Sequence, residues 1–396
     1  ISAGAAVHIL DPISRKYRES TSHDLYDIAR VCDTLEHIHF FQRSIVCRDL
    51  EDVREMDITT CYASVAGTKK HVGTSFSFPE NVDEALQMLH LIAGSEKAWR
   101  ERPFVSMSVC HVVPPLKFAE DASACLEAGV KGGMPVLLLS AGQAGATSPA
   151  TLARCVVQSV AEVIAGLVYV NAIQEGAPAI FGTWPFVSDL RTGAMSGGSG
   201  EQAVLMAACG QMAQFYNLPS GIAAGMTDSK IPDAQSGYEK GYTVALAGHS
   251  GANLIYESAG MHASLLGCCL ESYVIDNDML GAINRTVRGI EVNAETLSLD
   301  PIRDVCLDGP GHYLGHEQTL NRMQSDYLYP IVGDRENINN WIEQGSTDSI
   351  QRAHLKLKGI LKTHFPNNWD EDTDRKIREQ FPVRLPRNLM QFPEIS

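Results

Sequence analysis

Residues 225–258 read GMTDSKIPDAQSGYEKGYTVALAGHSGANLIYES, and this stretch decides the fold class. The residues just before it, Pro219–Ala224, form a short apolar run typical of a buried strand, and Ala252–Tyr256 is a second such run. A helix is predicted between them, from about Asp233. The order of strand, polar loop, helix, strand and polar loop is typical of an α/β barrel, whose chemistry lies on the loops that follow the strands.

Short apolar runs of this kind recur along the chain. We predict strands at His37–Arg43, His71–Phe76, Phe104–Val112, Val136–Ser140, Ala179–Thr183, Pro219–Ala224, Ala252–Tyr256 and Asp304–Leu307. Apolar residues at helical spacing predict helices at Val82–Ile92, Leu116–Ala128, Leu152–Ile173, Glu201–Phe215 and Tyr238–Leu246. Eight strands predict a closed (β/α)8 TIM barrel. We assign residues 1–333 to this catalytic barrel, and residues 334–396 to a C-terminal extension of polar helices and a tail, which we interpret as an outer cap or an oligomer arm.

Composition narrows the class of partner. The 47 acidic and 32 basic residues give a net charge of −15, which argues against nucleic acid as a partner. No apolar run long enough for a membrane span is expected, and the ten cysteines, without a CxxC pair, favour reduced thiols in a cytoplasmic protein. Because the chain begins at Ile1 and not at Met, we expect an N-terminal segment to precede it.

A loop of small residues follows the strand at 136–140 and contains Gln143. Its sequence, AGQAGATSP, is neither a phosphate-binding loop nor a dinucleotide fingerprint. Thr147 or Ser148 is predicted to cap a helix that opens at Pro149. The loop either faces a ligand or is a tight turn before a capped helix, and the sequence leaves both open.

Aromatic and acidic side chains follow three later strands. Trp184 and Phe186 are candidates for packing on a cation, although aromatic residues at a strand end can also be core plugs. Asp228 is either the counter-charge of a bound cation or an N-cap. Tyr256 and Glu257 are predicted to form the opposite wall. This combination suits a small organic cation.

Three further segments carry less specific signals. His312 and His316 would share a helix face, but neighbouring glycines weaken a helix and no third ligand has clear spacing, so a metal site is not favoured. An imidazole hydrogen bond from His312 to a substrate, or a purely structural role, remains open. The long loop 191–198 could act as a lid. The GHSG at 248–251 precedes a strand, so it is not a nucleophile elbow.

With these residues in view, the chain resembles the trimethylamine methyltransferase family. The matching stretches, in order, are LLLSAGQAGATSPATLA (137–153), EGAPAIFG (175–182), DLRTGAMSGGSGEQ (189–202), FYNLPSG (215–221), TDSKIPDAQSGYEK (227–240), GANLIYESAGM (251–261), VIDND (274–278) and GPGHYLGHEQTL (309–320). The resemblance implies a (β/α)8 barrel that moves a methyl group from an amine to the Co(I) of a separate corrinoid protein. Cobalamin would therefore come with that partner, and we expect no tightly bound cofactor, no membrane partner and a homo-oligomer.

Archaeal trimethylamine enzymes of this family carry pyrrolysine at a strand end, and the equivalent position here falls near Met226. No pyrrolysine occurs in the sequence. The resemblance is therefore to the non-pyrrolysine branch, which implies a quaternary amine substrate, with glycine betaine the leading candidate. The alternatives are proline betaine, carnitine, trimethylamine or another methylamine, a barrel that binds quaternary amines without turnover, and a zinc-assisted methyltransferase acting on a methoxy compound.

Overall fold

The structure is a computed structural model that describes residues 5–307 and 309–392. Seven strands run parallel to one another: β3 (Phe40–Gln42), β4 (His71–Thr74), β5 (Val105–Val109), β8 (Val136–Ser140), β10 (Ala179–Thr183), β12 (Gly221–Ala223) and β13 (Leu254–Tyr256). A five-stranded sheet has the order β10-β8-β5-β4-β3, and β12 pairs with β13. A bridge between Phe181 and Ser220 joins the two sheets.

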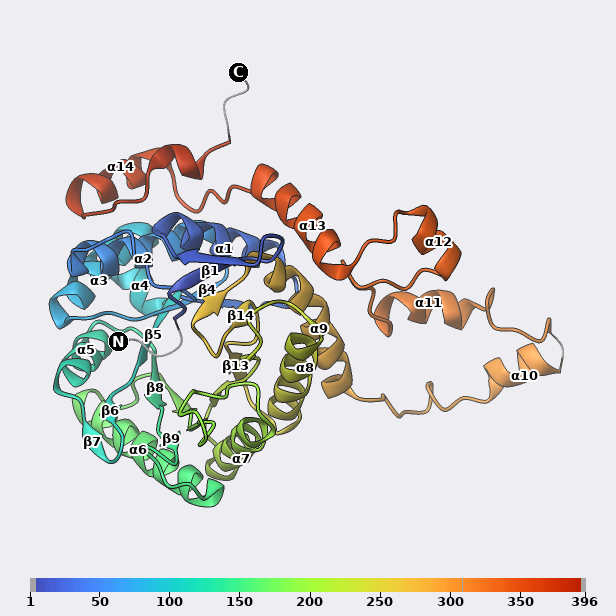
Figure 1. The fold of residues 1–396 in the computed structure, drawn as a ribbon, viewed down its shortest axis with the longest axis horizontal. Coiled ribbons are helices and arrows are strands. Elements are labelled where there is room, and N and C mark those ends of the chain that lie inside the picture. The colour runs from blue at the N-terminus through green and yellow to red at the C-terminus, as the bar shows by residue number, and fades with distance from the viewer. Residues whose placement is uncertain (1–4, 308, 393–396) are drawn as a thin grey trace.

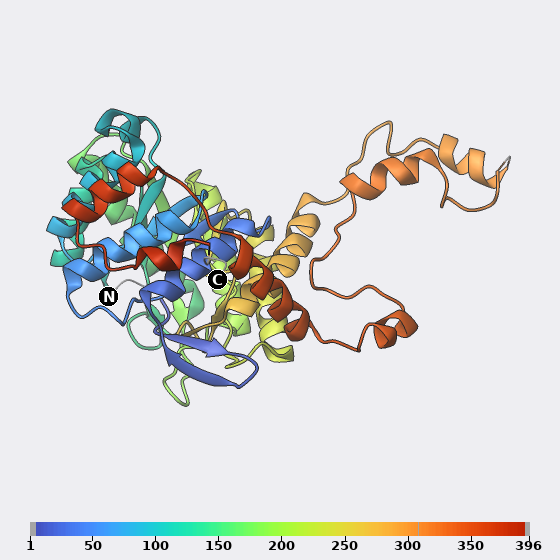
Figure 2. The ribbon, with the colours of Figure 1, turned by 90° about the horizontal axis from the view of Figure 1, so that it is seen from above.

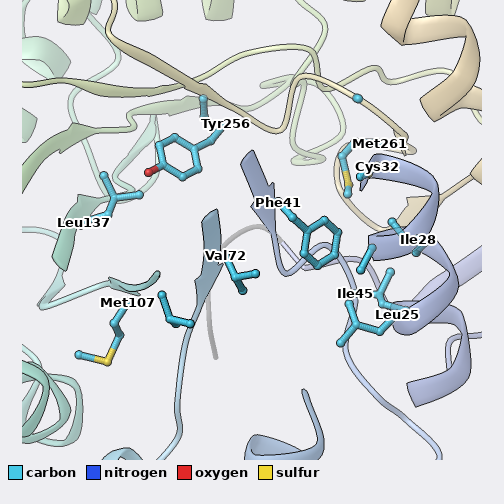
Figure 3. Close-up of a cluster of buried hydrophobic side chains, with 14 of the residues drawn as sticks. Leu25, Ile28, Cys32, Phe41, Ile45, Val72, Met107, Leu137, Tyr256 and Met261 are labelled. Atoms are coloured by element: carbon cyan, nitrogen blue, oxygen red, sulfur yellow. The ribbon is translucent and has the colours of Figure 1, made fainter. Parts of the chain in front are cut away.

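Helices alternate with these strands and surround them, as Figure 1 shows. They are α1 (Ser22–Thr34), α2 (Val53–Gly67), α3 (Pro79–Ala93), α4 (Glu96–Glu101), α5 (Glu120–Lys131), α6 (Leu152–Ile173), α7 (Gly200–Tyr216), α8 (Ala234–His249) and α9 (Leu270–Arg288). The core lies between strands and helices. In Figure 3, Phe41 and Ile45 point from the chain around β3 toward Leu25 and Ile28 of α1.

Further short strands lie at the start of the chain and within the loops that follow the parallel strands. They are β1 (His8–Asp11), β2 (Lys16–Glu19), β6 (Val112–Val113), β7 (Lys117–Phe118), β9 (Gln143–Ala144), β11 (Phe186–Val187), β14 (Met261–His262) and β15 (Gly267–Cys268). β1 runs parallel to β15, and Ala6 just before it bridges Ile45 in parallel.

The predicted eighth strand, Asp304–Leu307, is wrong. Residues Asp300–Cys306 form helix α10, because Pro301 in its first turn favours a helix start and removes a strand donor. Within the described residues no ladder joins β3 to β13, although the rings of Phe40 and Tyr256 meet with centroids 4.9 Å apart. The structure is therefore an α/β fold built on a curved parallel sheet, and the closed eight-stranded barrel is not established by its strand pairing.

Two local predictions also need correction. Helix α6 begins at Leu152 after the N-cap Thr151, so neither Thr147 nor Ser148 caps it. The Thr147 hydroxyl instead accepts the Gln143 N–H at 2.9 Å and closes the loop on itself. The second correction concerns the expectation that no apolar run is long enough to span a membrane. Helix α6 is, by length and composition, apolar enough to do so, with a mean hydropathy of 1.7 and one third of its apolar window buried.

After α9 the chain leaves the strands and their surrounding helices. Its elements are α10, α11 (Glu317–Ser325), α12 (Ile338–Glu343), α13 (Ser349–Thr363), α14 (Glu371–Gln380) and the 3-10 helix η1 (Arg387–Met390). Helices α10, α11 and α12 project away from the rest of the molecule (Figures 1 and 2), whereas α13 packs back against α1 and α9.

Candidate functional site

The loops at the carboxyl ends of the strands interlock over one end of the sheet. The loop after β8 pairs in parallel with the loop after β10, with Gln143 opposite Phe186. Two residues predicted from separate motifs are therefore neighbours in one short ladder. Because the ladder fixes both backbones, the two side chains are held at the same end of the molecule as the later loops.

Three aromatic rings, those of Trp184, Tyr256 and Phe40, pack against one another. The Trp184 indole packs 5.4 Å from the Tyr256 ring, which in turn meets Phe40. The indole N–H donates to the carbonyl oxygen of Gly221 at 2.7 Å, so the ring points back along the strands toward the start of β12. Trp184 is 1 % exposed and Tyr256 3 %. The three rings thus form one buried apolar cluster, and its hydrogen bond to Gly221 anchors Trp184 as a core residue.

Asp228 joins three loops. Its carboxylate accepts hydrogen bonds from the hydroxyl of Ser196, at 2.8 Å, and from that of Ser264. These hydroxyls belong to the loops that follow β10 and β13. The N-cap alternative is excluded, because Asp233 caps α8 by accepting the Ser236 N–H. Asp228 is therefore a half-buried carboxylate that fastens the predicted lid loop to its neighbours.

Glu257, directly after β13, has an unusual environment. Its backbone is left-handed, with φ +62°, a conformation uncommon for a residue other than glycine. Within the described residues its buried Oε1 has no hydrogen-bond partner. Burial raises the pKa of its carboxyl to about 8, and nearby Arg43 opposes part of that rise. The group is therefore largely protonated at neutral pH.

Arg43 follows β3 and was not singled out from the sequence. It is 7 % exposed, and burial lowers the pKa of its guanidinium. Among the described residues it forms no ion pair, and its Nε has no hydrogen-bond partner. Only its position one residue beyond an apolar strand could have drawn attention to it.

A cavity of about 320 Å³ separates β3 from β13 and extends along α8 and α9. Its walls are mostly apolar, and the predicted residues that line it are Tyr256 and Glu257. Gln42 and His37 add polar atoms. Its size and its mostly apolar walls are typical of a site for a small organic molecule.

The remaining two predicted positions lie elsewhere. Met226 is fully buried and lies against the lid loop: a Cβ added to Gly197 would be 2.8 Å from the Cβ of Met226. His312 lies in the projecting segment between α10 and α11 and is exposed. The fold of a single chain therefore does not bring His312 together with the other candidate residues.

Metal ligands do not gather near this site. Among residues 5–307 and 309–392, no three His, Cys, Asp or Glu side chains are arranged to hold a metal ion. The cavity is instead lined by the Tyr256 ring and the protonated Glu257 carboxyl, whereas Trp184 and Asp228 lie outside its lining. An apolar cavity with one such carboxyl can enclose a small organic cation and shield it from water.

Comparison with known proteins identifies the family of the chain. A family model described as trimethylamine methyltransferase matches residues 2–385. This match identifies a methyltransferase, and the chain belongs to the trimethylamine methyltransferase family.

The chain is similar to several curated methyltransferases. It is 33 % identical over 378 residues to a trimethylamine methyltransferase of Desulfitobacterium hafniense, covering 96 % of this chain and 75 % of the relative. A trimethylamine methyltransferase of Methanosarcina barkeri is 34 % identical, with 89 % and 71 % covered. A glycine betaine methyltransferase of Desulfitobacterium hafniense is 29 % identical, with 91 % and 74 % covered.

Solved structures are similar only at a distance. The dihydropteroate synthase of Vibrio fischeri has a TM-score of 0.36 at 12 % identity, covering 64 % of this chain and 81 % of that one. The carboxyl transferase domain of Rhizobium etli pyruvate carboxylase has a TM-score of 0.34 at 12 % identity, covering 99 % and 72 %.

Proposed function

We propose that this methyltransferase takes a methyl group from a quaternary amine, with glycine betaine as the leading candidate, and delivers it to a separate corrinoid protein. The observation that carries the proposal is the buried carboxyl of Glu257 beside the Tyr256 ring, at the edge of an apolar cavity, with an Oε1 that has no hydrogen-bond partner in the described part of the chain. A carboxyl that burial keeps protonated can ionise when a cation arrives, and the cation then takes the place of its proton.

A quaternary ammonium already carries the charge that the leaving group needs. When its methyl C–N bond breaks, nitrogen keeps the electron pair and departs as a neutral tertiary amine, so no general acid is required. The partner's cobalamin, as Co(I), supplies the nucleophile that accepts the methyl group. The chain must desolvate the cation and aim one methyl group outward, so its contribution is mainly positioning.

We assign roles to the predicted residues on this basis. Trp184, Phe186 and Tyr256 would pack on the trimethylammonium head group, where each ring contributes about 0.5–2 kcal/mol. Asp228 and Glu257 would set its charge environment. Gln143, His312 or the backbone N–H groups of the 142–148 loop would meet the substrate carboxylate. We add Arg43 to that group because its guanidinium is buried and its Nε has no hydrogen-bond partner among the residues that the structure describes.

The charge of this pocket must be moderate. The substrate loses its positive charge as the methyl group leaves, so a densely acidic site would stabilise the bound substrate more than the transition state. One half-buried carboxylate and one carboxyl that starts neutral satisfy this requirement. We further propose that the chain is a (β/α)8 barrel in which the position of the eighth strand lies between β3 and β13. We also propose that the protein is cytoplasmic.

Trimethylamine is the second candidate substrate. The matched trimethylamine methyltransferases are 33–34 % identical to this chain, against 29 % for the glycine betaine enzyme. We place the family's pyrrolysine position near Met226, an ordinary and fully buried residue, and this placement favours the quaternary amine.

A substrate panel tests the proposal. The protein is incubated with a reduced corrinoid protein and, separately, with glycine betaine, proline betaine, carnitine and trimethylamine, and loss of the Co(I) absorbance is followed. Glycine betaine should give the fastest loss. Binding without any loss would favour a non-catalytic barrel, and stoichiometric zinc with activity on a methoxy compound would favour the zinc-assisted class.

A further inference from the structure

The candidate cavity contains two hydroxyl groups to which the proposed reaction has assigned no role. Ser44 lies two residues after β3, Tyr273 lies in the first turn of α9, and both line the cavity. Each of the two residues is 4 % exposed. Glu257 directly follows β13 and lines the same cavity, so the two hydroxyls and this carboxyl lie near the carboxyl ends of the strands.

The Ser44 hydroxyl is buried without a partner. Its Oγ forms no hydrogen bond with any residue that the structure describes. A hydroxyl that is removed from water and left unpaired destabilises the folded protein. Unpaired buried groups are uncommon in folded proteins, and one that lines a cavity is explained if a ligand supplies the missing acceptor.

The Tyr273 phenol also has a proton to donate. Its ring packs against the backbone of Gly260, where an added Cβ would lie 2.2 Å from a ring carbon. The Cys268 thiol donates to the phenol oxygen at 3.6 Å, so within the described chain the phenol accepts a hydrogen bond and keeps its own proton available. Burial raises the pKa of Tyr273 well above its usual value, and the nearby Ser44 hydroxyl opposes part of that rise. The two hydroxyls are therefore neighbours, and both are protonated at neutral pH.

The chemistry of these groups defines what they can bind. Hydroxyl donors form stronger hydrogen bonds with a carboxylate than with a neutral acceptor. Glu257 supplies negative charge for a cation in the same cavity once it ionises. Arg43 does not itself line the cavity, so its guanidinium can support an anion by charge while direct contact falls to the hydroxyls. A short molecule with a cationic end and a carboxylate end matches this arrangement.

We infer that the hydroxyls of Ser44 and Tyr273 bind the carboxylate of a zwitterionic substrate, and that they select a betaine over trimethylamine. The inference rests on the proposed function, because it names the groups that hold the other end of the same substrate. A ligand without a carboxylate leaves both hydroxyls buried and unpaired, which is the basis of discrimination at such sites. The carboxylate keeps its charge throughout methyl transfer, so the two residues determine specificity and orientation.

Calorimetry with two ligands tests this inference. Glycine betaine has the carboxylate, whereas tetramethylammonium has the same kind of cationic head group without it. Wild type should bind glycine betaine more tightly than tetramethylammonium. Ser44→Ala and Tyr273→Phe should each weaken glycine betaine binding by about ten- to a hundredfold, the effect of losing a hydrogen bond to a charged group, and leave tetramethylammonium binding unchanged.

A buried serine away from the cavity gives the matched control. The Ser64 hydroxyl on α2 donates to the Thr60 carbonyl oxygen at 2.8 Å, and Ser64 is not part of the cavity lining. Ser64→Ala should therefore bind both ligands as wild type does. Urea unfolding without ligand adds a second readout, because Ser44→Ala removes an unpaired hydroxyl and should not lower the midpoint. Glycine betaine should then raise the midpoint of wild type more than that of Ser44→Ala.

Two results would overturn the inference alone. One is glycine betaine binding that neither Ser44→Ala nor Tyr273→Phe weakens, because the hydroxyls would then hold no more than buried water. The other is an equal loss of affinity for both ligands, which would give the residues a purely structural role. The substrate panel on wild type tests the proposed function without these variants, so loss of Co(I) with glycine betaine would leave that function standing. Failure of wild type to bind any quaternary ammonium would overturn both.

Discussion

The buried carboxyl of Glu257 and the buried guanidinium of Arg43 act on each other's pKa although they form no ion pair within the described residues. They follow β13 and β3, the two strands that border the candidate cavity. Each is left with an unpartnered polar atom, Oε1 of Glu257 and Nε of Arg43. Such an arrangement is costly in a folded protein, and a zwitterionic ligand between the two groups would satisfy both.

The first prediction concerns stability and pH. The pKa of Glu257 is about 8 in the folded protein and 4.5 in an ordinary environment, so the folded state holds its proton longer than the unfolded state. Stability should therefore fall as pH rises from about 4.5 to about 8, by at most about 1.4 kcal/mol per pH unit from this group. Glu257→Gln should remove that loss, so urea unfolding should find the variant more stable than wild type at pH 8 and nearly equal at pH 5. An equal difference at both pH values would contradict the assignment.

Ligand binding should release a proton from the same group. A quaternary ammonium next to Glu257 favours the ionised carboxylate, so affinity should rise up to about tenfold per pH unit below pH 8 and level off above it. Calorimetry in two buffers with different ionisation enthalpies measures the proton release directly. Glu257→Gln should bind without releasing a proton, and proton release that persists in this variant would assign it to another group.

Trp184 should affect both folding and binding, in separable ways. Trp184→Ala empties a buried site and should cost about 3–5 kcal/mol of stability. Trp184→Phe keeps an aromatic face but leaves the Gly221 carbonyl oxygen without its donor, so it should cost about 1–3 kcal/mol. If the ring packs on the substrate, Trp184→Phe should raise KM, by up to about thirtyfold. That limit corresponds to a loss of about 2 kcal/mol of binding free energy. An unchanged KM would reduce Trp184 to a core residue.

Asp228 should act by fastening the lid loop. Ser264→Ala removes one of its two hydroxyl donors and leaves its charge in place, whereas Asp228→Asn removes the charge and keeps an acceptor. If fastening is its role, both variants should make the 191–198 loop more sensitive to proteolysis. If charge is its role, only Asp228→Asn should weaken substrate binding, and calorimetry distinguishes the two outcomes.

Sequence periodicity predicts most of the repeated strand and helix units. Residues 136–140, 179–183 and 152–173 are predicted with the same bounds that the structure has, because continuous apolar runs between glycine and polar loops have few alternatives. Helix α1 was missed, although Leu25, Ile28, Ala29 and Cys32 have helical spacing and Thr21 with Asp24 forms a capping box.

The site is less accessible to sequence reasoning, because it depends on which loops meet. The residues after β8 and β10 lie side by side, as their shared end of the sheet implies. Nothing local to Arg43 or Phe40 predicts that β3 faces β13 across a cavity. A motif alone groups His312 with the other candidates, whereas the structure places it in the projecting segment between α10 and α11, whose base is held by Asp278 of α9.

The reaction itself gives the most direct test of the central claim. The protein is mixed anaerobically with its reduced corrinoid partner and glycine betaine, and Co(I) absorbance is recorded beside Glu257→Gln. The account predicts that wild type consumes Co(I) with one dimethylglycine formed per Co(I) lost, and that the variant is slower. If Co(I) persists with every betaine, carnitine and trimethylamine while the folded protein remains intact, the account is contradicted.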